Sequence, residues 1–283
     1  MATQQHDTTR EWGSDFFGTL NQLPPEPVAG IGGILEAMNA LPAFRDARRW
    51  MLRHLQLAHG AAVLEGGCGT GVALTDLVEM VGTAGRVAGV DPTEAFIATA
   101  RDRAEKARAT NARYEVGDIR AMPFADGAFD AAFCDKVLIH AGPPHTALGE
   151  MARVVRSGGR VGVVEWCPYF VLSTTDAGMG NAFNAIFAKA MYDYPVSANL
   201  ARHFHAAGLA AVRSEAFLAH TDSLDAHPFW RPFIIGQLPM FCHAGLIGEG
   251  DANALRDDLE GLEARGEFSA SFVVQAAVGV VTQ

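Results

Sequence analysis

Residues 63–71 read Val-Leu-Glu-Gly-Gly-Cys-Gly-Thr-Gly and decide the expected fold. An apolar strand segment runs into a glycine turn, and a helix-patterned segment follows at 71–81. In open α/β sheets this turn lies at the carboxyl end of a strand, where ligands bind. Glycines let the backbone approach a cofactor closely, and free N–H groups at a helix N-terminus favour an anion by about 0.3–1 kcal/mol per interaction. The stretch therefore predicts a ligand-binding loop, although a plain tight turn would also fit it.

The glycine spacing separates several kinds of loop. Dinucleotide-binding loops place glycines at relative positions 0, 2 and 5, whereas Gly67, Gly69 and Gly71 lie at 0, 2 and 4. The nucleoside-triphosphate loop requires Gly-Lys-Ser/Thr, but Val72-Ala73 follows the last glycine. Both phosphate-binding interpretations are therefore weakened.

Strand and helix patterns alternate along the middle of the chain. Strands are expected at 61–66, 86–90, 113–116, 129–134 and 160–165, and helices at 71–81, 94–109 and 144–155. Such alternation is typical of βαβ units. Strands at 211–219 and 269–281 are expected to form an antiparallel pair. The sequence thus predicts an α/β fold: a doubly wound, mostly parallel, seven-stranded Rossmann-like sheet with a C-terminal antiparallel hairpin and a helical cap.

The remaining segments are expected to cover this sheet. Residues 1–60 show helical spacing and are predicted to be an N-terminal helical part of the cap. Residues 61–283 would form the main domain, with helical insertions at about 167–207 and 224–265.

Composition and charge bear on the class of partner. Hydrophobic residues make up 49% and charged residues 19%, which is typical of a compact globular protein. The net charge is −10 and no basic stripe with interleaved aromatics occurs, so a small molecule is expected rather than nucleic acid. No apolar run reaches the roughly 18 residues of a membrane span, no signal peptide is recognisable, and the four cysteines lack Cys-x-x-Cys spacing. A cytoplasmic protein without a membrane span is expected; the oligomeric state is left open.

Acidic residues follow the next two expected strands. Asp91 ends the stretch Gly-Val-Asp at 89–91, and Asp118 follows Gly117. A carboxylate at the end of the second strand can accept both hydroxyl hydrogens of a ribose. Successive strand ends thus offer the adjacent polar groups that a ligand site needs.

Taken together, these segments resemble the class I S-adenosylmethionine-dependent methyltransferases, in particular the small-molecule group related to the ubiquinone and menaquinone methyltransferases. The resemblance extends over roughly residues 45–166. It is carried by the segments 63–71, 89–91, 117–118, 129–133, 137–140 and 150–160. It implies S-adenosylmethionine as the cofactor and methyl transfer as the reaction.

The resemblance also implies a role for each matching residue. The glycine loop would frame the methionine part of the cofactor, acidic residues would hold its ribose and adenine, and apolar residues would flank the adenine ring. In that order these are Glu65, Gly67 and Gly69 for the methionine part, Asp91 for the ribose, Asp118 for the adenine amino group, and Pro92 and Ile119 for the ring, with Asp135 near the methionine end. Cys68, in the same loop, is also expected to contact the cofactor.

Two departures from the family pattern affect different parts of the chain. Ser157 replaces the usual proline before Gly-Gly at 158–159, which concerns only the stiffness of a turn. Gly142-Pro143 stands where an acidic residue and proline are usual after His140, and this puts the acceptor side of the site in doubt.

His140 is the candidate catalytic residue. Methyl transfer from a sulfonium is an in-line displacement, so holding the acceptor about 3 Å from the methyl carbon supplies much of the acceleration. A general base contributes roughly 10²–10⁴-fold when the acceptor carries a proton. His140 follows the fourth expected strand, and imidazole titrates near neutral pH; a packed or capping histidine is the alternative. His203 and His205 would point to different faces of a helix, so no metal site is expected.

The expected activity is methyl transfer to a small, apolar organic acceptor at oxygen, carbon or nitrogen, in the manner of secondary metabolism. Aromatic residues outside the α/β repeat suggest the roof of an apolar pocket, while a core role explains any one of them singly. They are Trp12, Phe16, Phe17, Tyr169, Phe170, Phe183, Phe187, Tyr192, Tyr194, Phe229, Trp230 and Phe233. The alternative is a cofactor-binding scaffold without methyl transfer, either a cyclase or a binding module. A nicotinamide-dependent reductase is a weaker third possibility. The acceptor atom, the substrate and the pathway stay open.

Overall fold

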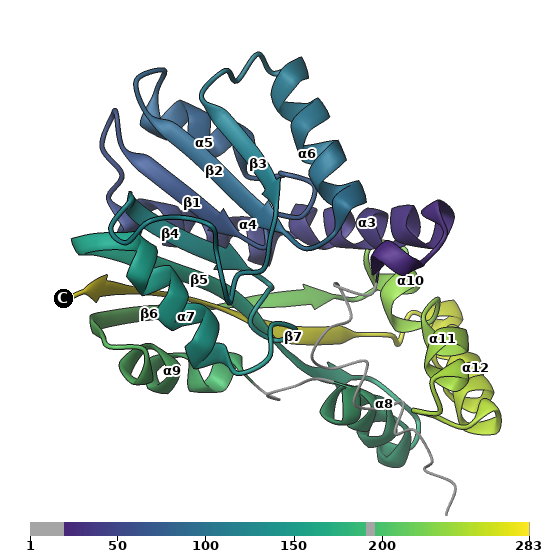
Figure 1. Cartoon of the computed structure of the whole chain (residues 1–283). Helices are drawn as coiled ribbons and strands as arrows, with labels where there is room; N and C mark the ends of the chain where they lie inside the picture. The colour runs from purple at the N-terminus through teal and green to yellow at the C-terminus, as the bar shows by residue number, and fades with distance from the viewer. Residues whose placement is uncertain (1–19, 191–195, 283) are drawn as a thin grey trace, which may run out of the picture.

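A seven-stranded sheet forms the centre of the computed structural model, which describes residues 20–190 and 196–282 (Figure 1). The strand order is β3-β2-β1-β4-β5-β7-β6. The strands are β1 (Ala62–Gly66), β2 (Arg86–Asp91), β3 (Ala112–Val116), β4 (Phe129–Asp135), β5 (Val155–Leu172), β6 (Leu209–Thr221) and β7 (Ala270–Val281). Strands β1 to β5 pair in parallel, and β7 is antiparallel to both β5 and β6. The predicted α/β sheet with its C-terminal antiparallel pair is confirmed.

Helices cover the sheet along its length. They are α3 (Pro25–Ala40), α4 (Pro42–Leu55), α5 (Leu74–Val81), α6 (Glu94–Lys106), α7 (Pro144–Val154), α8 (Ala177–Ala190), α9 (Leu200–Ala206), α10 (Trp230–Ile234), α11 (Leu238–His243) and α12 (Glu249–Arg265), with short 3-10 turns at Leu20–Gln22 and Ser197–Asn199. Strands β1 and β4 are buried along nearly their whole length, which is typical of parallel strands covered on both faces. No helix among these described residues is long and apolar enough to cross a membrane.

The strand order creates a switch point between β1 and β4. From β1 the chain proceeds to β2 and β3 on one side, and β4 and β5 then follow on the other side. The loops that leave β1 and β4 therefore run in opposite directions and leave a crevice at the carboxyl ends of these strands. The expected glycine loop lies at this place.

Strand β5 is longer than the sequence pattern predicts. A helical insertion is expected from about 167, but β5 continues to Leu172, and the next helix begins at Ala177. The reason is a period-two pattern: Trp166 and Phe170 are buried, whereas Tyr169 and Val171 are exposed. Pairing of Val171 with Ser271 on β7 extends the sheet beyond the α/β unit. Clustered aromatic residues hide this alternation in the sequence.

The aromatic residues of the expected insertions form a core of their own. Phe187 stacks on Phe233 at 5.9 Å between ring centroids, and Phe229 stacks on Phe233 at 4.7 Å. Phe170 and Phe272 join them at 5.1 Å. These rings come from β5, β7, α8, α10 and the residue before α10 and are buried against one another, and Phe183 and Trp230 are buried with them. Of the expected roof residues, 12, 16, 17, 192 and 194 lie outside the described residues.

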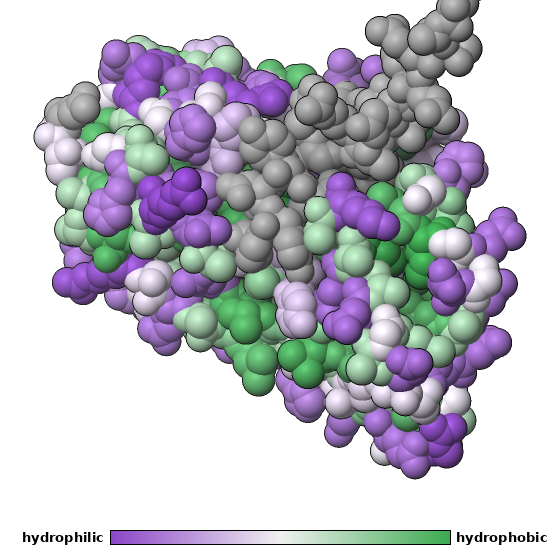
Figure 2. Space-filling model, turned by 90° about the horizontal axis from the view of Figure 1, so that it is seen from below, coloured by the Kyte–Doolittle hydropathy of each residue, from purple (hydrophilic) through white to green (hydrophobic). Residues whose placement is uncertain are grey.

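The surface mixes polar and apolar residues. Figure 2 shows hydrophilic and hydrophobic residues interspersed on the face seen from below. Exposed large apolar side chains include Val171, Leu218 and Val273 at the extended end of the sheet, where Leu218 pairs directly with Val273. Between 224 and 265 the structure has three helices, α10, α11 and α12, where two are expected.

Candidate functional site

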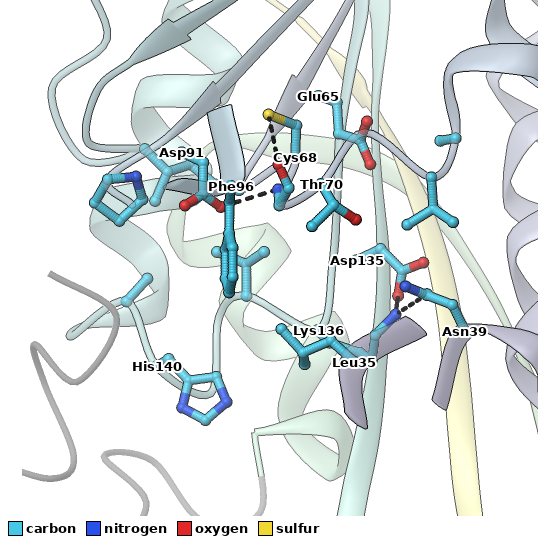
Figure 3. Close-up of a pocket in the computed structure, with 18 of the residues that line it drawn as sticks. Leu35, Asn39, Glu65, Cys68, Thr70, Asp91, Phe96, Asp135, Lys136 and His140 are labelled. Carbon is cyan, nitrogen blue, oxygen red and sulfur yellow. Dashed lines mark hydrogen bonds and ion pairs between the residues drawn. The ribbon is translucent and has the colours of Figure 1, made fainter. Parts of the chain in front are cut away.

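All residues singled out from the sequence as cofactor or catalytic candidates line one pocket at the carboxyl ends of β1 to β4 (Figure 3). They are Glu65, Gly67, Cys68, Gly69, Asp91, Pro92, Asp118, Ile119, Asp135 and His140. The pocket encloses about 1110 Å³, including its opening to solvent. The structure brings these residues together; the role of each one stays a prediction.

The glycine loop closes tightly under the strand ends. Gly67 has a φ of +68°, and a Cβ atom there would run into the side chain of Val137. The N–H of Cys68 donates to the carbonyl of Val90 at 2.9 Å, which ties the loop to β2. Burial raises the pKa of the Cys68 thiol, so the side chain is neutral. The glycines of this turn therefore bring the backbone close to the pocket, beside the side chains of Cys68 and Thr70.

Asp91 joins the end of β2 to the glycine loop. Its Oδ2 accepts the N–H of Gly69 at 2.9 Å, and its Oδ1 accepts the N–H of Thr93 at 2.9 Å. Burial raises the pKa of this carboxyl, while the two backbone hydrogen bonds oppose that rise. Asp91 is only 6% exposed and still lines the pocket.

Glu65 is a buried acid with an unused acceptor atom. It stands near the end of β1 and is 5% exposed, and its Oε2 accepts no hydrogen bond among the described residues. Burial raises the pKa of Glu65 to about 8, although the nearby charge of Arg48 works in the opposite direction. A buried acceptor without a donor costs about 1–3 kcal/mol, so this atom is a natural place for a ligand donor.

A buried ionic cluster around the predicted site residue Asp135 faces Glu65 across the pocket. Its other members, Arg48, Lys136 and Asn39, were not predicted from the sequence. Arg48 on α4 contacts Asp135 at the end of β4 through Nε and Nη2, at 2.7 and 2.6 Å. Lys136 contacts the other oxygen of Asp135 at 2.5 Å, and both cations donate to Oδ1 of Asn39 on α3. Burial would raise the pKa of Asp135, but the charges of Lys136 and Arg48 hold it below its usual value. Burial lowers the pKa of Lys136, and the charge of Asp135 opposes that fall. With its ammonium group on Asp135 and Asn39, Lys136 joins Arg48 as the second basic side chain on one ionised carboxylate.

His140 lies in the loop between β4 and α7. Figure 3 draws it at the end of the pocket away from Glu65. Its backbone N–H donates to the carbonyl of Val137 at 2.9 Å, which fixes the turn. Burial lowers the pKa of the imidazole to about 4, so the ring is neutral at pH 7. A neutral imidazole has one nitrogen that can accept a proton.

Asp118 lies after β3 and is engaged by Arg120, two residues later. The backbone N–H and Nε of Arg120 donate to Oδ1 at 2.8 and 3.0 Å, and Nε and Nη2 donate to Oδ2 at 2.9 and 2.6 Å. Burial would raise the pKa of Asp118, but the hydrogen bonds from Arg120 hold it below its usual value. Ile119 packs beneath Gly66, where a Cβ would lie 2.6 Å from its Cδ1. Arg120 is a further pocket residue that the sequence did not single out.

Comparison with known proteins agrees with this geometry. Residues 63–159 match the family model described as "Methyltransferase domain". A demethylmenaquinone methyltransferase of Beutenbergia cavernae is 30% identical over 177 residues, which are 57% of this chain and 70% of that enzyme. The chain belongs to the class I S-adenosylmethionine-dependent methyltransferases. The expected family, enzyme class and cofactor are thereby confirmed.

Other similarities to this methyltransferase are shorter or concern the fold alone. An uncharacterized 37.1 kDa protein in transposon TN4556 of Streptomyces fradiae is 37% identical over 134 residues, 47% of this chain and 38% of that protein. The chain thus spans well under half the length of that relative. The crystal structure of the YcgJ protein of Bacillus subtilis superposes with a TM-score of 0.60 at 17% identity, over 84% of this chain and 99% of that one. It shares the Rossmann-like fold.

Proposed function

We propose that this methyltransferase moves the methyl group of S-adenosylmethionine to a small organic acceptor with an apolar body. The observation that carries the proposal is the charge pattern of the pocket. The unused Oε2 of Glu65 faces a cluster in which two cations, Arg48 and Lys136, share the single carboxylate of Asp135. The cluster has a net charge of +1, since two positive charges stand against one negative.

This pattern fits the amino-acid end of the cofactor. The methionine part is a zwitterion, with an ammonium group and a carboxylate. An ammonium supplies the donor that Glu65 lacks, and its positive charge favours the ionised form of that acid. The carboxylate matches the surplus positive charge of Arg48 and Lys136. An uncharged ligand would supply neither a positively charged donor for Glu65 nor a carboxylate for Arg48 and Lys136.

The rest of the pocket suits the nucleoside. Asp91 binds the glycine loop through Oδ2 and the backbone of Thr93 through Oδ1, and it still lines the pocket. A carboxylate offers about four acceptor positions, so Asp91 can also accept a ribose hydroxyl. Pro92 and Ile119 are apolar and would flank the adenine ring, and Asp118 would meet its amino group.

The bound cofactor supplies an electrophilic methyl carbon on a sulfonium. The acceptor atom forms a bond to that carbon as the carbon–sulfur bond breaks, and the sulfur keeps the electron pair as a neutral thioether. The chain's task is to hold the acceptor in line. If the acceptor is a hydroxyl, the neutral ring of His140 takes its proton.

Apolar side chains near the mouth support an acceptor with an apolar body. Leu35 and Phe96 come from α3 and α6, and Val137 and Ala141 come from the loop that carries His140. The matching relatives include enzymes named for demethylmenaquinone and for a sterol, both apolar molecules. The buried aromatic core gives no such support, because its rings pack on one another and none of them lines this pocket.

Titration calorimetry with S-adenosylhomocysteine tests the cofactor site. A second assay tests the reaction: S-adenosylmethionine is incubated with each member of a panel of phenols, quinols and carboxylic acids, and the S-adenosylhomocysteine formed is measured. We expect micromolar binding and turnover with at least one apolar acceptor. Binding without product formation on the whole panel would favour the scaffold alternative. Tighter binding of NADH than of S-adenosylhomocysteine would overturn the proposal.

A further inference from the structure

Arg120 contacts both oxygens of the carboxylate that the cofactor's adenine is expected to use. A carboxylate offers about four acceptor positions, two on each oxygen. Three N–H groups of Arg120 contact Asp118 at 2.6–3.0 Å: the backbone N–H reaches Oδ1, Nη2 reaches Oδ2, and the single Nε–H is shared between both oxygens. Both oxygens thus contact the guanidinium, so an incoming amino group competes with the Arg120 side chain for them. Asp91 differs, because backbone N–H groups rather than a cation donate to its oxygens.

We propose that Arg120 competes with the cofactor's adenine for Asp118 and that, once displaced, its guanidinium binds a carboxylate on the methyl acceptor. The inference rests on the proposed function and deepens it by naming an acidic acceptor. The position of the Arg120 side chain then depends on whether adenine is bound, and Arg120 acts as a specificity-determining residue for the acceptor.

The ion pair is weak enough for a ligand to open. The side chains of Arg120 and Asp118 are 31% and 41% exposed, so solvent screens their attraction. The corresponding exposures are 9% and 6% in the pair of Arg48 with Asp135, which a ligand would not separate easily. Of these two ion pairs, only the pair of Arg120 with Asp118 is exposed enough for a ligand to replace one partner.

The position of Arg120 gives the displaced guanidinium a place on the acceptor side. Its Nη1 lies 3.3 Å from where a Cβ of residue 142 would stand, and glycine occupies that position with a φ of +78°. Gly142 is two residues from His140, the candidate base, and Ala141 between them lines the pocket. The guanidinium thus lies between the adenine subsite and the loop where the acceptor is expected, and a planar guanidinium pairs with a carboxylate in bidentate fashion.

The first experiment measures whether Arg120 and the adenine of the cofactor compete for Asp118. S-adenosylhomocysteine is titrated into the intact protein, Arg120→Ala and Arg231→Ala, in parallel with S-inosylhomocysteine, which has no 6-amino group. Arg231 is a matched control because it makes a bidentate pair with Asp225 at exposures of 36% and 63% and does not line the pocket. We expect Arg120→Ala to bind the adenosyl ligand up to about fivefold more tightly, with no gain for the inosyl ligand and none in Arg231→Ala. Unchanged or weaker adenosyl binding in Arg120→Ala overturns the competition.

The second experiment measures the acidic acceptor site, with benzoate as the probe and benzamide as its neutral counterpart. We expect the intact protein to bind benzoate at least fivefold more tightly when S-adenosylhomocysteine is present, and Arg120→Ala to lose this gain. Equal benzoate binding with and without S-adenosylhomocysteine, or an equal gain for benzamide, overturns the acceptor assignment. If no variant binds S-adenosylhomocysteine, the proposed function itself fails. If all bind it equally, that function stands and the role of Arg120 falls.

Discussion

Arg48 and Asp135 form a buried ion pair at 2.6 Å that joins a helix before the sheet to the carboxyl end of β4. Their side chains are 9% and 6% exposed. The pair lies outside the glycine loop, yet it fixes one wall of the same pocket, and Asn39 of α3 joins it through Arg48 and Lys136. The N-terminal helices are therefore part of the binding site and not only a cover for the sheet.

Replacing Arg48 with alanine is expected to reduce stability and cofactor affinity together. The substitution removes two charge-assisted contacts to Asp135, which costs about 1.5–3 kcal/mol, while Lys136 still pairs with that carboxylate. Urea unfolding should show a loss of this order, and S-adenosylhomocysteine should bind at least tenfold more weakly where the variant is folded. Arg49→Ala is the control, because Arg49 lies next on the same helix in an exposed pair with Asp46; its effect should stay within about 0.5 kcal/mol. Similar losses in both variants would contradict the assignment.

Cofactor binding is expected to release a proton from Glu65. In the ligand-free protein its pKa is about 8, so the acid is protonated at pH 7. An ammonium beside it favours the ionised form, so affinity should rise with pH by up to about tenfold per unit below pH 8 and level off above it. Calorimetry with S-adenosylhomocysteine at pH 6.5, in phosphate and in Tris, reports the released proton as a difference in observed heat. Glu65→Gln should abolish this difference; equal heats in the two buffers for the unchanged protein would refute the mechanism.

The stability of the ligand-free protein is expected to fall as the pH rises. Glu165 is fully buried on β5 and accepts the N–H groups of Ile139 and Trp166 at 3.2 Å, and burial raises its pKa to about 8. The folded pKa exceeds the ordinary value of 4.5, so the folded state holds the proton more strongly. The resulting stabilisation is complete below about pH 4.5 and is lost as pH rises through 8, with a slope of up to about 1.4 kcal/mol per unit.

Thermal unfolding between pH 5 and pH 8 checks this slope. Glu165→Gln should reduce the slope by about half, because the amide carries no titrating proton while Glu65, whose pKa is also about 8, still titrates. Glu115→Gln changes an exposed acid at the edge strand and should leave the slope as it is. Parallel curves for the Glu165 variant and the unchanged protein would show that this acid does not titrate in the expected range.

Local patterns in the sequence were sufficient to predict the strand ends that form the pocket. The glycines at 67, 69 and 71 and the acids at 91 and 118 lie at or just after the carboxyl ends of successive predicted strands, so chain order alone predicts that they meet at one edge of a parallel sheet. The sequence pattern predicts too early an end for strand β5, because the last residues of that strand are rich in aromatic side chains, which also suit a helix.

The ionic cluster could not be predicted in the same way. Arg48 meets a partner 87 residues away, and the contact depends on how α4 packs against the sheet. One signal was present: Arg48 lies four residues after Phe44 and seven before Leu55, on the face of α4 that carries its buried apolar residues. A charged residue on an apolar helix face predicts a buried partner, but it does not say which one.

His140 provides the most direct test of the chemistry. Its ring is neutral at pH 7 because burial lowers its pKa to about 4, so it can accept a proton without first losing one. His140→Ala should reduce kcat by roughly 10²–10⁴-fold with a hydroxyl acceptor and leave the affinity for S-adenosylhomocysteine within about twofold. His145→Ala is the control, since that side chain is exposed on α7. With the unchanged protein, kcat should hold from pH 8 down to about pH 5 and fall as the imidazole protonates near pH 4. An undiminished kcat in His140→Ala with a hydroxyl acceptor would assign this histidine to packing of the loop, and in-line positioning alone would then account for the transfer.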